Sequence, residues 1–236
     1  MTELQPHLHV HTGRRPAEAV VLVLHGGREV NADPVSARQL AVLRLIPFAR
    51  RIAHRGNGRV AVARLRYRTR GWNAGGDATP APVLDAQWAL DQLSERFGEL
   101  PFGIVGHSMG GRTALRVGGH RQVRGVVGLA PWLPAGEPVR QLLGRQVLLM
   151  HGTADRMTDP RGSASFADRL EEAGGTVSLA RIDGGRHAML RRAGLWHELA
   201  AQFVLSTVLT GYQPSDRADA PNFIHRVPSA PGRITY

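Results

Sequence analysis

The chain has 236 residues, of which 42% are hydrophobic, and this size and composition suit one folded domain and exclude a disordered polar chain. It has no cysteine, which excludes disulfides, thiolate metal sites and a cysteine nucleophile. The formal charge is +11, but all 30 basic residues are arginines spread along the chain, which is more typical of codon bias than of a binding patch. Nucleic-acid binding is therefore not expected, and an arginine-lined pocket for an anionic substrate is favoured over it.

The N-terminal region lacks the basic start and apolar core of a signal peptide, and the apolar stretches are far too short to span a bilayer. We therefore expect a cytoplasmic protein without a membrane span. The absence of cysteine does not bear on this expectation, because secreted proteins can also lack cysteine.

Short apolar runs alternate with longer amphipathic segments, a pattern typical of a mostly parallel sheet covered by helices. The first buried strand is predicted at Val20–His25. Asp33-Pro34 then opens a helical stretch that reaches about His54, with a kink or a break at Pro47. Further strands are predicted at 60–65, 102–106, 123–129, 147–150 and 176–182, and further helices at 83–97, 109–118, 163–173 and 195–210.

The two ends of the chain carry weaker patterns. His7, His9 and His11 would share one face of a strand, but no acidic ligand accompanies them at a zinc spacing, so an exposed strand without metal is expected. Residues 1–212 are predicted to form one domain. Residues 213–236 contain several prolines and show no apolar period, which predicts an extended C-terminal tail.

The strongest motif is the run from Gly106 to Gly110, which reads Gly-His-Ser-Met-Gly between a predicted strand and a predicted helix. This strand–turn–helix context is the one that a nucleophile elbow requires. The turn is so tight that the residues flanking Ser108 must be very small, and the helix N-terminus behind Ser108 favours developing negative charge. We therefore predict Ser108 as a nucleophile.

A nucleophilic serine that attacks a carbonyl needs N–H donors for the oxyanion that forms. The backbone amide of Met109, directly after Ser108, is one predicted donor. His25-Gly26-Gly27 at the end of the first strand is predicted to supply the other, from Gly27, with Arg28 as the alternative. His25 is expected to brace this loop.

A base and its orienting acid are predicted after the two late strands. Asp155 follows the strand at 147–150 and is favoured as the acid over Asp159 because it lies closer to the strand end. His187 follows two glycines after the strand at 176–182, and these glycines let the loop bend back over the sheet edge. His151 is an alternative base, although a structural role is expected for it.

These motifs, in the order serine, acid, histidine, resemble those of the α/β-hydrolase superfamily, and the resemblance extends over about Val20 to Thr210. In length and layout the chain is similar to compact esterases and to dienelactone-hydrolase-like members. The resemblance implies a doubly wound, mostly parallel sheet, a covalent acyl-enzyme, and no metal or organic cofactor. Dienelactone hydrolases usually carry cysteine as the nucleophile, so their particular substrate is not expected here.

The sequence thus predicts a serine hydrolase that cleaves a carboxylic ester, with a thioester or an amide as a less favoured small-molecule substrate. An acyltransferase with the same triad, or a non-catalytic binding protein on this fold, are the alternatives. The segment from Pro131 to Gln146 is short for the helical cap that many family members insert, so little or no lid is expected.

Overall fold

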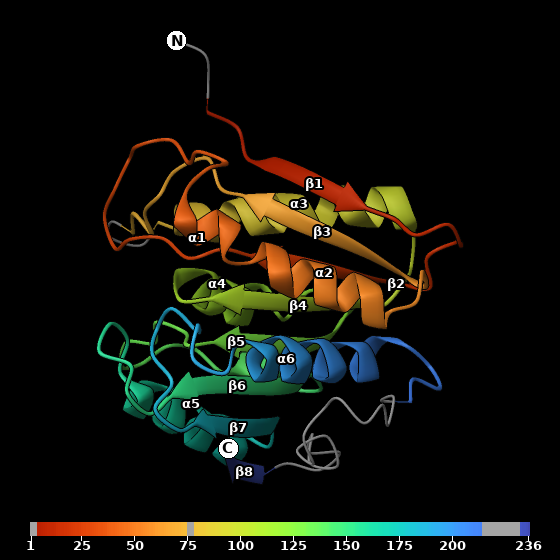
Figure 1. Ribbon diagram of the computed structural model, residues 1–236. Coiled ribbons are helices and arrows are strands. Elements are labelled where there is room, and N and C mark those ends of the chain that lie inside the picture. Colours follow the sequence, from red (N-terminus) through yellow and green to blue (C-terminus); the bar gives the residue numbers. More distant parts are fainter. Residues whose placement is uncertain (1–3, 75–77, 214–231) are drawn as a thin grey trace.

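The computed structural model describes residues 4–74, 78–213 and 232–236. Its centre is an eight-stranded sheet with the order β1-β3-β2-β4-β5-β6-β7-β8 (Figure 1). β1 runs antiparallel to β3, and every other neighbouring pair of strands is parallel. The strands are β1 (His7–His11), β2 (Ala19–Leu24), β3 (Val60–Arg66), β4 (Phe102–His107), β5 (Val123–Leu129), β6 (Gln146–Gly152), β7 (Thr176–Ile182) and β8 (Gly232–Thr235).

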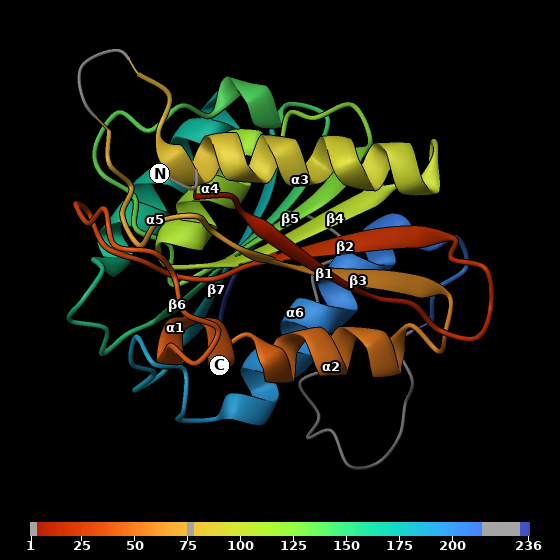
Figure 2. The ribbon, with the colours of Figure 1, turned by 90° about the horizontal axis from the view of Figure 1, so that it is seen from above.

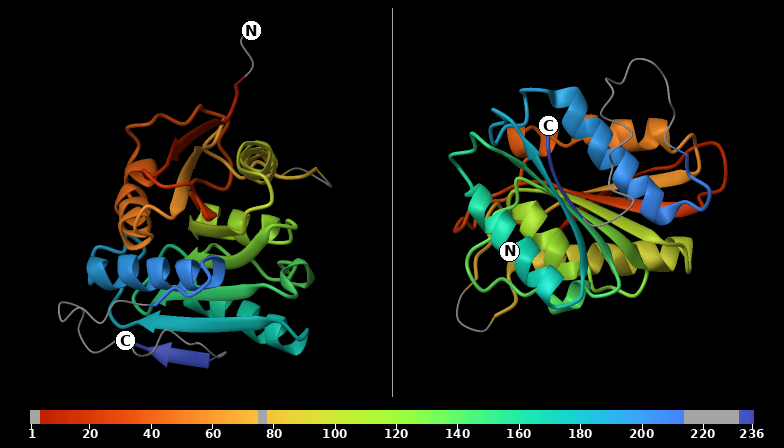
Figure 3. Two further views of the ribbon diagram at one scale, coloured as in Figure 1. Left: turned by 90° about the vertical axis from the view of Figure 1, so that its right-hand side faces the viewer. Right: turned by 90° about the horizontal axis from the view of Figure 1, so that it is seen from below.

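Helices cover both faces of this sheet (Figure 2). They are α1 (Leu40–Leu43), α2 (Ile46–Arg55), α3 (Ala81–Phe97), α4 (Met109–Val117), α5 (Pro160–Glu172) and α6 (Ala193–Val208). α3, α4 and α5 bury one apolar cluster against the sheet, and α2 and α6 bury a second cluster on the other face. α2 and α6 also pack on each other (Figure 3). The predicted α/β fold with a doubly wound, mostly parallel sheet is confirmed.

The central strands are mostly apolar because both of their faces are covered. Every residue of β2 and of β4 is buried. β2, β4, β6 and β7 are parallel, so their carboxyl ends lie at one edge of the sheet. Loops that follow these strands therefore meet at that edge, where ligand sites of open α/β sheets are found.

The predicted helix start at Asp33 is wrong. The N–H of Asp33 donates to the side-chain oxygen of Asn31 at 2.9 Å, and Pro34 forms a β-bridge with Thr69, so this segment is a loop. The helices begin later, as α1 and α2. Pro47 lies in the first turn of α2, where a missing N–H costs nothing, and this explains the predicted break in the helical stretch.

The connection from β5 to β6 contains only one short 3-10 helix, η1 (Arg140–Leu142), which confirms the prediction of little or no lid. Within the predicted tail, residues 214–231 lie outside the described residues. β8 follows them and pairs in parallel with β7. β8 is not among the strands that the sequence predicts. In the described ranges no helix is both long enough and apolar enough to cross a bilayer.

Candidate active site

Ser108 lies between β4 and α4 in a strained backbone conformation, with φ of 55° and ψ of −117°. A side chain in this region costs about 1–3 kcal/mol and persists only where the surroundings impose it. The surroundings here are two glycines, because a Cβ on Gly106 would lie 2.1 Å from the carbonyl oxygen of Gly110. The predicted elbow geometry is therefore present, and α4 begins directly behind Ser108.

The loop after β2 packs against this elbow. A Cβ on Gly26 would lie 3.3 Å from Cβ of Ser108, and a Cβ on Gly27 would lie 2.5 Å from Sδ of Met109. The structure thus brings Gly27 and Met109 together beside Ser108. The N–H of Arg28 donates instead to the carbonyl of Arg70 at 2.8 Å, which removes the alternative oxyanion donor.

His25 braces this loop, as expected. Its Nδ1 donates to the carbonyl of Gly26 at 2.7 Å, and its Nε2 accepts from the N–H of Tyr67 at 3.3 Å. Burial lowers the pKa of His25 to about 4, so its ring is neutral near pH 7. A single neutral tautomer satisfies both contacts.

Asp155 follows β6 in a turn that its own carboxylate stabilises. Oδ1 accepts the N–H groups of Met157 at 2.8 Å and Thr158 at 3.1 Å, and Oδ2 lies 2.9 Å from Nδ1 of His187. Burial raises the pKa of Asp155, but hydrogen bonds from His151, His187 and these two amides outweigh it, so the pKa lies well below its ordinary value. The carboxylate is therefore charged and fixed in direction.

Asp159, the alternative acid, has a different position. It is the N-cap of α5, where its side chain accepts the N–H of Arg161 at 2.9 Å and forms an ion pair with the same arginine. Its contacts in the structure are those of a helix cap. The structure thus brings Asp155, and not Asp159, to His187.

Two further side chains contact the Asp155 carboxylate. Oγ1 of Thr158 lies 3.0 Å from Oδ2 of Asp155 and 3.2 Å from Nδ1 of His187. Nε2 of His151 lies 3.4 Å from the same oxygen, while its Nδ1 contacts Oγ of Ser163 at 2.7 Å. Sequence reasoning missed Thr158, although a hydroxyl three residues after a turn aspartate is a signal that points to such a contact. His151 has the structural role expected of it.

His187 lies in the loop after β7, which turns at Gly184 with φ of 61°. Its ring is half-buried, and the ring centroid lies 4.7 Å from that of His107, the residue before Ser108. The carbonyl oxygen of His187 contacts Nε2 of His107 at 3.0 Å. The loops that follow β4, β6 and β7 therefore bring the three predicted triad residues to one edge of the sheet.

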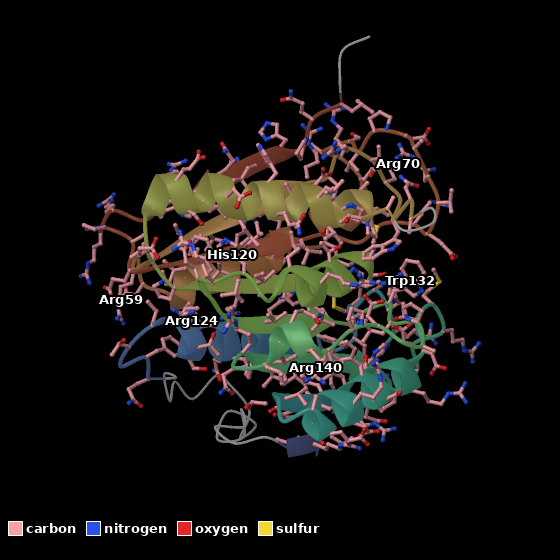
Figure 4. All side chains as sticks on the ribbon, turned by 180° about the vertical axis from the view of Figure 1, so that it is seen from behind. Arg59, Arg70, His120, Arg124, Trp132 and Arg140 are labelled. Atoms are coloured by element: carbon pink, nitrogen blue, oxygen red, sulfur yellow. The ribbon has the colours of Figure 1, made fainter. Side chains whose placement is uncertain are left out.

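Two tryptophan rings, Trp72 and Trp132, pack against the guanidinium of Arg112 near the elbow. Cζ of Arg112 lies 4.0 Å from the ring centroid of Trp72 and 4.6 Å from that of Trp132. Nε of Arg112 donates to the buried carboxylate of Glu137 at 2.7 Å. The N–H of Trp132 donates to the carbonyl of Ser108 at 3.1 Å. Figure 4 shows Trp132 at the end of the sheet that the elbow occupies.

The weaker sequence signals have structural explanations. His7, His9 and His11 lie on the exposed face of β1, and no group of three or more potential metal ligands occurs in the part of the chain that is described. In the loop after β3, the Arg68 guanidinium forms an ion pair with the buried Asp85.

Compared by sequence, the chain matches no family profile and no curated protein. Solved structures match its fold. Esterase Est1E from Butyrivibrio proteoclasticus, in a structure with ferulic acid bound, aligns with a TM-score of 0.65 at 12% identity over 86% of this chain and 95% of that one. The serine hydrolase XC6422 from Xanthomonas campestris, described as having no lid, aligns with a TM-score of 0.65 at 19% identity over 88% and 91%. Esterase Pf2001 from Pyrococcus furiosus gives 0.61 at 15% identity over 82% of each chain.

These likenesses extend over most of each chain. The protein therefore has the fold of the α/β hydrolases, as the resemblance of its motifs implied.

Proposed function

We propose that this protein is a serine hydrolase that cleaves a carboxylic ester of a small molecule through an acyl-enzyme. The observation that carries the proposal is the Asp155–His187 hydrogen bond of 2.9 Å at the sheet edge where Ser108 occupies a strained elbow. A charged, fixed carboxylate holds the imidazole with Nδ1 protonated, which leaves Nε2 free to accept a proton.

In the proposed reaction Ser108 attacks the ester carbonyl while Nε2 of His187 takes the hydroxyl proton. The amides of Gly27 and Met109 donate to the oxyanion of the tetrahedral intermediate. The alcohol then leaves with the proton from His187. Water then attacks the acyl carbonyl while the same nitrogen takes its proton, and His187 returns that proton to Oγ of Ser108 as the acid is released.

The wall of Trp72, Arg112 and Trp132 is proposed to lie along the acyl group. Trp132 is partly exposed and is bonded through its backbone to Ser108, so it offers an aromatic face close to the reacting carbonyl. Esters of hydroxycinnamic acids are therefore suitable test substrates beside simple alkyl esters, and the structure of Est1E with ferulic acid points the same way.

The test is hydrolysis of nitrophenyl esters of increasing acyl length and of a ferulate ester, by the wild type and by Ser108→Ala. We expect turnover by the wild type and a loss of about 10³-fold or more in the variant, because no nucleophile remains. A fluorophosphonate should label the wild type at Ser108 and leave the variant unlabelled. A wild type that neither turns over an ester nor accepts the label would contradict the proposal.

A further inference from the structure

His107 is a buried histidine to which the proposed reaction gives no role. It is the last residue of β4 and is 1% exposed. Its Nε2 lies 3.0 Å from the carbonyl oxygen of His187, 80 positions further along the chain. A carbonyl oxygen only accepts hydrogen bonds, so Nε2 of His107 must carry the proton and donate it.

The rest of the His107 ring is also fixed. Burial lowers its pKa to about 3, so the ring is neutral and holds one N–H. With Nε2 protonated, Nδ1 is a bare acceptor, and it is buried without a partner among the described residues. A Cβ on Gly26 would lie 3.2 Å from this Nδ1. The single N–H of the ring is thus committed to the backbone of His187.

The loop that carries His187 is anchored on both sides of that residue. The carbonyl of Gly185 accepts from the N–H of Ala154 at 3.0 Å. On the other side, Met189 is buried, and its N–H donates to the carbonyl of Arg186 at 2.8 Å. The bond from His107 falls between these anchors, on the peptide group of His187 itself, and so fixes the backbone from which the imidazole projects.

We propose that His107 is a positioning residue whose Nε2–H holds the carbonyl of His187, and through it the His187 imidazole, in place over the elbow. The inference rests on the proposed function and adds a second fixed point for the base. Asp155 fixes the tautomer and rotation of the ring, and His107 fixes the backbone that carries the ring. His107 itself transfers no proton.

Two substitutions of similar volume separate the hydrogen bond from the packing. His107→Leu removes the donor, whereas His107→Gln places an amide N–H₂ near the position of Nε2. We expect His107→Leu to lower kcat by about 10²-fold with little change in KM, because misplacing a catalytic group by about 1 Å has an effect of that size. His107→Gln should keep most of the activity. A leucine and a glutamine variant with equal losses would overturn the proposal.

His120→Leu is the matched control. His120 is a half-buried histidine that stacks on Phe102, at the other end of β4 (Figure 4). The His120→Leu substitution should leave kcat unchanged. The thermal unfolding midpoint of each variant shows whether that variant is still folded.

A double-mutant cycle tests whether His107 acts through His187. In a His187→Ala background, His107→Leu should leave the residual activity unchanged, because the imidazole that it positions is gone. If His107→Leu costs the same factor in both backgrounds, His107 acts on the elbow and the proposal fails.

A measurement without substrate keeps this inference separate from the proposed function. With ¹⁵N-labelled histidine, the ring signals of His187 should shift or broaden in His107→Leu and stay in place in His107→Gln and His120→Leu. Unchanged His187 signals in His107→Leu would overturn the inference even if ester hydrolysis stands. The expected change in a protein that cleaves no ester would support the His107–His187 link and sink the proposed function.

Discussion

Asp155 and Asp159 are four positions apart and chemically identical, yet their surroundings give them different tasks. Asp155 is buried and accepts hydrogen bonds from two amides, whereas Asp159 is an exposed helix cap. The proposed role of Asp155 is to hold His187 in the tautomer that accepts a proton from Ser108. An amide at this position would present either the wrong atom or no charge to Nδ1 of His187.

We therefore expect Asp155→Asn to lower kcat on a nitrophenyl ester by about 10³- to 10⁴-fold while the protein stays folded. Asp159→Asn is the control, and its kcat should stay near that of the wild type. Circular dichroism on both variants checks the fold. Near-normal turnover in Asp155→Asn would remove Asp155 from the proposed mechanism.

At this scale the sequence predicts positions better than contacts. Ser108, Asp155 and His187 each follow a strand, and parallel strands bring such residues to one edge, so their proximity follows from chain order and strand direction. The contact of Thr158 with Asp155 has a local signal in the spacing of the two residues, which sequence reasoning overlooked. The contact of His107 with His187 instead depends on how the loop after β7 packs against the end of β4. No local pattern encodes that packing, and sequence reasoning did not find it.

Among the connecting elements, the loop from β5 to η1 is held by charge rather than covered by a cap. The Glu137 carboxylate is buried and accepts from Arg112 at 2.7 Å, and it also bonds Arg116. Its backbone carbonyl accepts from Arg169 of α5 at 2.7 Å. The same loop carries Trp132, so these bonds fix one side of the candidate site.

Glu137→Gln should destabilise the protein by about 3 kcal/mol, because it leaves Arg112 partly buried without its counter-charge. KM for aromatic esters should rise as Trp132 loosens. Urea unfolding measures the first effect and steady-state kinetics the second. Glu99→Gln is the control, because it breaks an exposed ion pair with Arg121, and it should change neither the free energy of unfolding nor KM. An unchanged unfolding midpoint in Glu137→Gln would show that the ion pairs do not hold the loop.

Element types were largely predictable, whereas element boundaries depended on local competition. The apolar runs that became β2, β4, β5, β6 and β7 are long enough to identify by composition. Asp33-Pro34 resembles a helix start, but a side-chain bond to Asn31 captured the aspartate N–H instead. β8 lies at the edge of the sheet, where it pairs with one strand only and stays partly exposed. An edge strand of this kind does not need the apolar run that identifies a buried strand in the sequence.

For the whole molecule, the buried neutral histidines predict how stability depends on pH. Burial lowers the pKa of His25 to about 4 and that of His107 to about 3. In the unfolded chain the pKa of both histidines is about 6.5. Between these pKa values the unfolded state binds protons that the folded state does not bind. The free energy of unfolding therefore rises with pH across this window and levels off above about 6.5.

As the pH falls from 6.5 towards 4, each of these histidines should therefore remove up to about 1.4 kcal/mol per pH unit from the free energy of unfolding. At still lower pH, protonation of Asp155, whose pKa is lowered in the folded state, also reduces the free energy of unfolding. Asp85, whose pKa is raised by burial, offsets part of this loss. Urea unfolding at pH 7.5, 6 and 5 measures the slope. His107→Gln lacks one of the titrating groups and should give a shallower slope, and a slope unchanged by the substitution would contradict this account.

The strained backbone of Ser108 matters for any redesign of this chain for stability. At φ of 55° a glycine would relieve the strain, so the most stable residue for this position is not the one that is present. A procedure that ranked substitutions by stability alone would choose glycine here and delete the proposed nucleophile. The serine at this position is thus explained by the proposed chemistry and not by the backbone preference of the fold.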